Sequence, residues 1–155
     1  MTRYAQAERR ALADLLAAVG PDAPTLCEGW TARDLAAHLV VRERRPDAAA
    51  GLVLPPLRGW GDKVRAEQAL TPYAEIVDRV RHPPRWSPVS NPLTDEVANG
   101  LEFFIHHEDV RRAVPGWQPR RLPAEQEAVL WRRAKGVARL ALRRFRGAVL
   151  VQAPG

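Results

Sequence analysis

The sequence predicts an all-α protein built as an antiparallel four-helix bundle. Four main segments carry apolar residues at helical spacing, the connections between them are short to medium, and a strand pattern is nearly absent. A chain of 155 residues can bury one core but not two independent ones. We therefore expect a helix-bundle domain over residues 1–146, followed by a short tail over 147–155.

The first two helices have clear boundaries in the sequence. Apolar residues recur every three or four positions over residues 3–19, and Gly20 then stops the pattern. The second helix is expected to begin after Thr31, a suitable N-cap, with Asp34 adding negative charge to the first turn. It should extend until Pro46, which interrupts helical geometry.

The middle of the chain alternates between helix and loop signals. Residues 47–60 contain two glycines and two prolines and are expected to be irregular, and helix should resume over 61–70. Thr71 is expected to act as an N-cap, with proline at the first helical position, so residues 73–80 should begin a new helix or a kinked continuation of the preceding one. The segment 82–92 holds four prolines and should be a non-helical loop.

Two further helices complete the expected bundle. Residues 94–113 begin with Asp95 and Glu96, whose negative charge suits the first turn of a helix. The last helix is expected over 123–145. Residues 147–152 are apolar enough for a short strand, which is too isolated to define a sheet.

Composition narrows the function classes. The net charge is +6, but the basic residues are dispersed and no helix-turn-helix or zinc-finger pattern accompanies them, so a solvated surface is favoured over a nucleic-acid partner. The chain has no apolar run of the ~20 residues that span a bilayer and no signal-peptide pattern, so a cytoplasmic protein without membrane contact is expected. Cys27 is the single cysteine, which excludes an internal disulfide and is expected to be a buried, inert thiol.

The most specific chemical pattern lies in the helix expected over 94–113. Glu102, His106 and Asp109 stand at i, i+4 and i+7 and share one face of it. Residues four apart have Cβ atoms ~5–6 Å apart, so a metal ion bound at ~2 Å could be shared by Glu102 and His106. These donors suit Zn²⁺, Ni²⁺, Mn²⁺ or Fe²⁺. Asp109 could orient the His106 ring or face the open side of the site. The alternative is an exposed Glu-His pair without an ion.

A second helix offers a third donor. His38 lies among apolar neighbours and is either a satisfied core histidine or a metal ligand. Together with Glu102 and His106 it would complete the three-ligand arrangement of an open catalytic site. Arg42, one turn after His38, is a candidate for binding a carboxylate-bearing substrate. His107 points ~100° away from its neighbour His106 on the helix and should not bind the same ion.

Two segments of the chain resemble a known family. Residues 25–39 (TLCEGWTARDLAAHL) are similar to the GW(T/S)xxDLxxHL segment of the DinB-like superfamily, in its branch with the mycothiol-dependent maleylpyruvate isomerase metal-binding domain. Residues 102–109 (EFFIHHED) resemble the ExxxHxxD signature of that family, and residues 42–47 extend the likeness to an actinobacterial subfamily of metal-binding proteins.

The resemblance implies a four-helix bundle that holds a divalent metal, usually zinc, through His38, Glu102 and His106. It further implies a transferase or isomerase that uses a low-molecular-weight thiol, mycothiol in actinobacteria, on small electrophilic substrates. Many members carry a β-containing carboxy-terminal region, which is expected to be absent or reduced here. The alternative is a non-catalytic metal-binding or stress-response bundle, which could be a homodimer, in which the ion mainly stabilises the fold.

Overall fold

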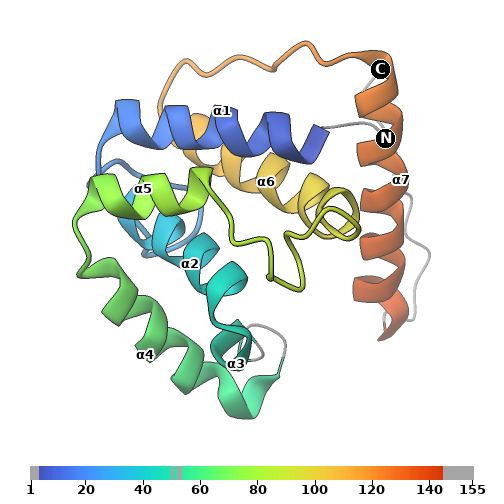
Figure 1. Cartoon of the computed structure of the whole chain (residues 1–155). Coiled ribbons are helices and arrows are strands. Elements are labelled where there is room, and N and C mark those ends of the chain that lie inside the picture. The colour runs from blue at the N-terminus through green and yellow to red at the C-terminus, as the bar shows by residue number, and fades with distance from the viewer. Residues whose placement is uncertain (1–3, 50, 52–53, 145–155) are drawn as a thin grey trace. The chain divides into compact units, whose positions relative to one another are not determined.

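The structure is a computed structural model that describes residues 4–49, 51 and 54–144. Within this part of the chain the regular elements are all helical, which confirms the predicted fold class (Figure 1). The helices are α1 (Tyr4–Val19), α2 (Ala32–Arg44), α3 (Pro46–Ala49), α4 (Arg58–Ala69), α5 (Tyr73–Arg81), α6 (Asp95–Arg111) and α7 (Ala124–Ala141), with 3-10 turns η2 (Pro55–Leu57) and η3 (Leu142–Arg144). None of the described helices is long and apolar enough to cross a membrane.

The chain divides into two compact units, residues 1–118 and 119–155. The first unit contains α1 to α6, and the second contains α7 and η3. The last helix, which was expected to belong to the same bundle as the others, therefore falls in a unit of its own. The expected bundle end at residue 146 and the expected strand over 147–152 lie outside the described residues.

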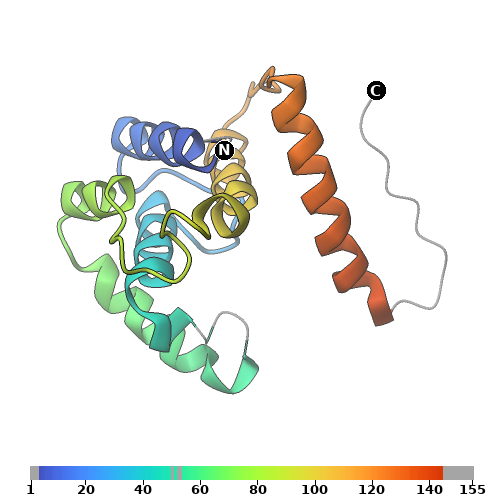
Figure 2. The ribbon, with the colours of Figure 1, turned by 45° about the vertical axis from the view of Figure 1, so that its right-hand side comes forward.

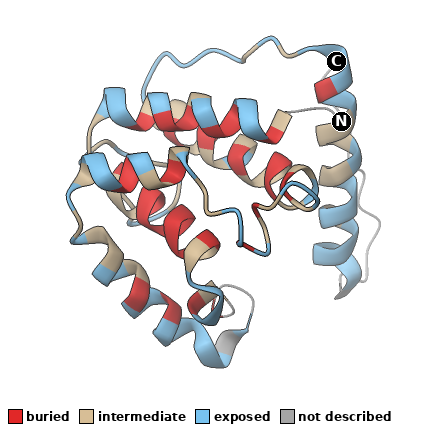
Figure 3. Ribbon diagram, viewed as in Figure 1, coloured by how far each residue is buried: buried red, intermediate tan, exposed pale blue. Residues whose placement is uncertain are grey.

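The first unit packs around α1 and α2. Helix α1 lies along α6 and also contacts α5, while α2 packs mainly against α4 and α5 (Figures 1 and 2). Buried residues gather on the inward sides of α1, α2 and α5 (Figure 3). The largest apolar side chains of this core are Leu12, Leu16, Leu35, Leu39, Ile76 and Phe103.

The structure corrects the expectation that residues 47–60 are irregular. Pro46 ends α2 but also begins the short helix α3, because proline is well suited to the first helical turn. Helix α4 begins at Arg58, three residues before the expected start. The expected cap at Thr71 was also wrong: Pro72 is the N-cap of α5, and the Thr71 hydroxyl accepts a hydrogen bond from Gln68 instead.

The start of α2 is as predicted. Thr31 is the N-cap, and both its backbone N–H and its hydroxyl donate to the Asp34 carboxylate, at 3.2 and 2.9 Å. Arg65 on α4 donates to the other oxygen of Asp34 at 2.6 Å. Because these bonds occupy both carboxylate oxygens, they fix the entry into α2 and with it the helix that carries His38.

A buried ion pair that the sequence did not reveal joins α1 to α2. Arg9 Nη1 and Nη2 donate to the two carboxylate oxygens of Glu43 at 2.9 and 2.5 Å, and both side chains are almost completely buried. Ser90 donates to Glu43, and Asp95 at the start of α6 also faces Arg9, at 3.4 Å. The pair therefore holds three helices and the loop before α6 in register.

Candidate metal centre

Helices α2 and α6 bring the three predicted ligands together. Nε2 of His38 lies 3.5 Å from Oε1 of Glu102, and Nε2 of His106 lies 3.4 Å from the same oxygen. One donor atom from each of the three residues lies within 4.8 Å of the others. The grouping predicted from the sequence is therefore present, although His38 and Glu102 are 64 residues apart in the chain.

The spacing of these donor atoms fits a bound divalent metal. Two ligand atoms that each lie ~2.1 Å from a tetrahedral ion are ~3.4 Å from one another. The separations of 3.5 and 3.4 Å on either side of the Glu102 oxygen match this value. Two imidazole nitrogens and one carboxylate oxygen are also donor types that zinc and neighbouring divalent metals accept.

The cluster lies between the core and the solvent. The side chain of His38 is 10% exposed and that of His106 14%, whereas that of Glu102 is 28% exposed. The Trp30 ring lies 5.2 Å from the His38 ring, and Arg65 lies above Trp30. Trp30 thus packs beside the His38 ring, and Glu102 is the most exposed of the three residues.

The charges in the cluster favour an ionised carboxylate. Burial alone would raise the pKa of Glu102, but hydrogen bonds with His106 and His38 and the charge of Arg42 outweigh it and hold that pKa far below its usual range. Burial lowers the pKa of His38, which favours its neutral, metal-binding form. At His106 burial is outweighed by hydrogen bonds with Asp109, Cys27 and Glu102, which raise the pKa to about 11.

Asp109 occupies the other edge of the His106 ring. Its Oδ2 lies 2.9 Å from Nδ1 of His106, so the ring is held with Nε2 towards Glu102 and His38. A carboxylate that accepts a hydrogen bond from a metal-binding histidine fixes the orientation of the ring and raises its basicity. Of the two roles that the sequence left open for Asp109, this geometry is the orienting one.

Cys27 lies beside this pair, which the sequence did not reveal. Its thiol, which was expected to be buried and inert, is half-buried, and Sγ lies 3.3 Å from Oδ2 of Asp109. Together with His106, these residues form a second group whose donor atoms lie within 4.8 Å of one another. The loop before α2 places Cys27 here because the N–H of Leu26 donates to the backbone oxygen of Asp109 at 3.1 Å. No local sequence pattern encodes this contact between distant segments, so the sequence could not place Cys27 beside Asp109 and His106.

Arg42 contacts α6 through all three guanidinium nitrogens. Nε lies 3.4 Å from Oε1 of Glu102, Nη2 donates to the backbone oxygen of Ala98 at 2.9 Å, and Nη1 donates to the side chain of Asn99. Asn99 is fully buried and was not singled out by the sequence. These contacts make Arg42 a support for Glu102, and substrate binding by Arg42 stays a prediction.

The remaining histidines lie outside the cluster, as predicted. Nδ1 of His107 lies 2.9 Å from Oε2 of Glu8, so this buried ring packs between α6 and α1. His82 pairs with Asp78 on the exposed end of α5, at 3.0 Å. Among the described residues, neither His82 nor His107 belongs to a cluster of possible metal ligands.

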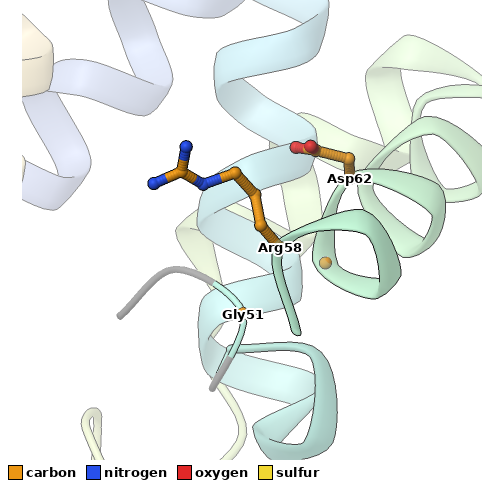
Figure 4. A pocket seen from close by; sticks show the side chains of 4 residues that line it. Gly51, Arg58 and Asp62 are labelled. Carbon is orange, nitrogen blue, oxygen red and sulfur yellow. The ribbon is translucent and has the colours of Figure 1, made fainter. Parts of the chain in front are cut away.

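A pocket beside the start of α4 is a separate feature. Gly51, Arg58, Gly61 and Asp62 line it (Figure 4). Its charged side chains are one arginine and one aspartate, and none of the candidate metal ligands contributes to it.

Comparison of the chain with protein-family models, with curated proteins and with solved structures gives no match. The assignment of a function therefore rests on the positions of His38, Glu102 and His106 and on the chemistry of their donor atoms.

Proposed function

We propose that this protein binds one divalent metal ion, zinc, through His38, Glu102 and His106, and uses the site for thiol-dependent chemistry on small electrophilic molecules. The observation that carries the proposal is the spacing of the three donors, with 3.5 and 3.4 Å between the histidine nitrogens and the shared Glu102 oxygen. Three protein ligands leave at least one coordination position open, as catalytic zinc sites require.

The proposed arrangement of the helices that carry this site is an antiparallel four-helix bundle of the DinB-like kind. Helices α1, α2, α5 and α6 are the candidates for its members, because α1 packs on both α5 and α6 and α2 packs on α5. Bundles of this kind build metal sites from side chains on facing helices. The two sequence segments that resemble the DinB-like superfamily include the proposed ligands.

The residues around the proposed ion have separate tasks. A bound zinc ion would supply Lewis acidity and would favour the thiolate form of mycothiol or of another low-molecular-weight thiol. Asp109 holds the His106 ring at a fixed angle, and Arg42 holds the Glu102 carboxylate. The Trp30 ring packs beside the His38 ring, with 5.2 Å between the ring centroids.

The experiment for this proposal is turnover of a panel of small electrophiles by the zinc-loaded protein, with and without mycothiol or a simpler thiol. We expect turnover that requires both the thiol and Glu102, with loss of activity in Glu102→Gln. His82→Ala is the matched control, because His82 is an exposed histidine outside the cluster. Zinc binding without turnover by any thiol would contradict the catalytic part of the proposal.

One observation favours the non-catalytic alternative. Helix α2 packs mainly on α4 and α5, whereas α6 packs mainly on α1. An ion held by His38 on α2 and His106 on α6 would therefore join two helices whose backbones are not closely packed, in addition to the side-chain contacts that Arg42 makes with α6. If the ion has only this structural role, zinc will raise the unfolding temperature, and the panel of electrophiles will not react.

A further inference from the structure

The His106 ring lies between two carboxylates. Nε2 lies 3.4 Å from Glu102, on the side of the proposed zinc site, and Nδ1 lies 2.9 Å from Asp109, on the opposite edge. The Asp109 edge also holds the thiol of Cys27, with Sγ 3.3 Å from the same Asp109 oxygen that faces His106. Sulfur, nitrogen and oxygen donors thus meet at Asp109, within 4.8 Å of one another.

We propose that Cys27, Asp109 and the Nδ1 edge of His106 form a second metal-binding set, which takes a thiophilic divalent cation such as Cd²⁺. The set with His38 and Glu102 offers only nitrogen and oxygen, whereas this one adds a thiolate. Soft metal ions prefer thiolate ligands, and borderline ions accept imidazole and carboxylate. The Nδ1 edge of His106 should therefore bind soft metal ions, and the Nε2 edge should bind borderline ions such as zinc.

The loop that carries Cys27 holds its thiol close to α6 before any ion binds. The Leu26 N–H donates to the Asp109 backbone oxygen at 3.1 Å, and the Trp30 N–H donates to the Cys27 backbone oxygen at 2.9 Å. The Thr25 hydroxyl accepts from the Cys27 N–H at 3.2 Å and closes the turn. Because the backbone is fixed on both sides of Cys27, little conformational entropy remains to be lost when the thiol binds an ion.

The two sets exclude one another at His106. When an ion occupies Nδ1, the Nε2–H can donate to Glu102, and when an ion occupies Nε2, the Nδ1–H can donate to Asp109. A neutral imidazole has one free lone pair, so it binds one ion at a time. The second set does not depend on His38 or Glu102, and its test can therefore be separated from that of the proposed function.

The test is titration of the full-length protein with Cd²⁺ alone, followed by thiolate-to-cadmium charge-transfer absorption. Cys27 is the single cysteine, so the signal reports on one site. We expect a charge-transfer band at one Cd²⁺ per chain in the wild type and in a His38→Ala/Glu102→Gln double variant, and no band in Cys27→Ser. The expected loss of Cd²⁺ affinity in Asp109→Ala is roughly tenfold or more.

Two results would overturn the second set. One is a wild-type protein without a charge-transfer band at saturating Cd²⁺. The other is an Asp109→Ala variant with unchanged Cd²⁺ affinity, which would show a lone thiol and not a chelating group. If Asp109→Ala does not fold, as judged by circular dichroism, Asp109→Asn takes its place with the same expected direction. Loss of zinc binding in the double variant with Cd²⁺ binding retained would separate the two proposals.

Discussion

Oδ2 of Asp109 lies 2.9 Å from Nδ1 of His106 and 3.3 Å from Sγ of Cys27. One carboxylate oxygen therefore connects the loop before α2 to the histidine that the proposed zinc site requires. A shift of the loop that carries Cys27 would therefore reach the His106 ring through Asp109.

Replacement of Asp109 by asparagine should weaken zinc binding without removing a ligand. The amide is a weaker acceptor for the Nδ1–H of His106, so we expect zinc affinity to fall roughly 10- to 100-fold. Competition with a chromophoric chelator measures the change. Asp78→Asn is the matched control, because Asp78 pairs with the exposed His82. Equal zinc affinity in Asp109→Asn and the wild type would refute the orienting role.

Replacement of Arg42 by lysine should disturb Glu102, because lysine keeps the positive charge but lacks the three nitrogens of the guanidinium group. A lysine ammonium cannot contact Glu102, Asn99 and Ala98 at once, as the guanidinium does. We expect lower zinc affinity, by roughly tenfold, together with a lower unfolding temperature of the zinc-free protein. Arg45→Lys, at an exposed pair with Asp47, should change neither quantity. A variant that binds zinc as tightly as the wild type would leave Arg42 with a structural role alone.

Loss of one partner of the buried pair between Arg9 and Glu43 should destabilise the first unit strongly. Removal of one charge leaves the other buried and unpaired, so Glu43→Gln is expected to cost about 3–5 kcal/mol in the free energy of unfolding. Urea denaturation gives the value. The exposed pair Glu75–Arg79 is the comparison, and Glu75→Gln should cost less than about 1 kcal/mol. A similar cost for the two changes would argue against the buried network.

Ionisation of the Tyr73 phenol should lower the stability of the protein at alkaline pH. Burial raises the pKa of its phenol to about 12, partly opposed by Arg33, and the hydroxyl donates to the backbone oxygen of Leu16. An unfolded tyrosine has a pKa of about 10. Between pH 10 and 12 the unfolded chain binds fewer protons than the folded one, so this contribution is complete below about pH 10 and is lost as pH rises.

Tyr73→Phe tests this dependence. The variant should lose about 1 kcal/mol at neutral pH, because it lacks the hydrogen bond to Leu16. It should also lose less stability than the wild type between pH 8 and pH 11, measured by urea denaturation at each pH. An equal alkaline loss in both proteins would mean that the phenol does not titrate as described.

The part of the site that could be predicted from the sequence is the part that a single helix determines. Helical geometry alone places Glu102, His106 and Asp109 on one face, and the structure keeps them there. His38 was found because its helix has a clear start and an apolar face. The contacts of Arg42 with Asn99 and Ala98 could not be predicted in the same way, because they depend on how α2 packs against α6.

The features that the sequence could not predict depend on contacts between distant segments. Cys27 belongs to a loop whose position is set by a backbone bond to Asp109, 83 residues beyond Leu26. Charged residues such as Arg9 and Glu43 would be expected on the surface, but the packing of α1 against α2 and α6 buries them. The helix α3 was missed because Pro46 both ends one helix and begins the next.

Zinc content is the most direct test of the proposed site. The measurement is made in a Cys27→Ser background, so that the set around Asp109 lacks its thiol. After zinc loading and dialysis, we expect about one ion per chain in this background and in its His82→Ala control. The His38→Ala and Glu102→Ala variants should retain little or none. Full zinc content in both variants would contradict a metal centre formed by His38, Glu102 and His106.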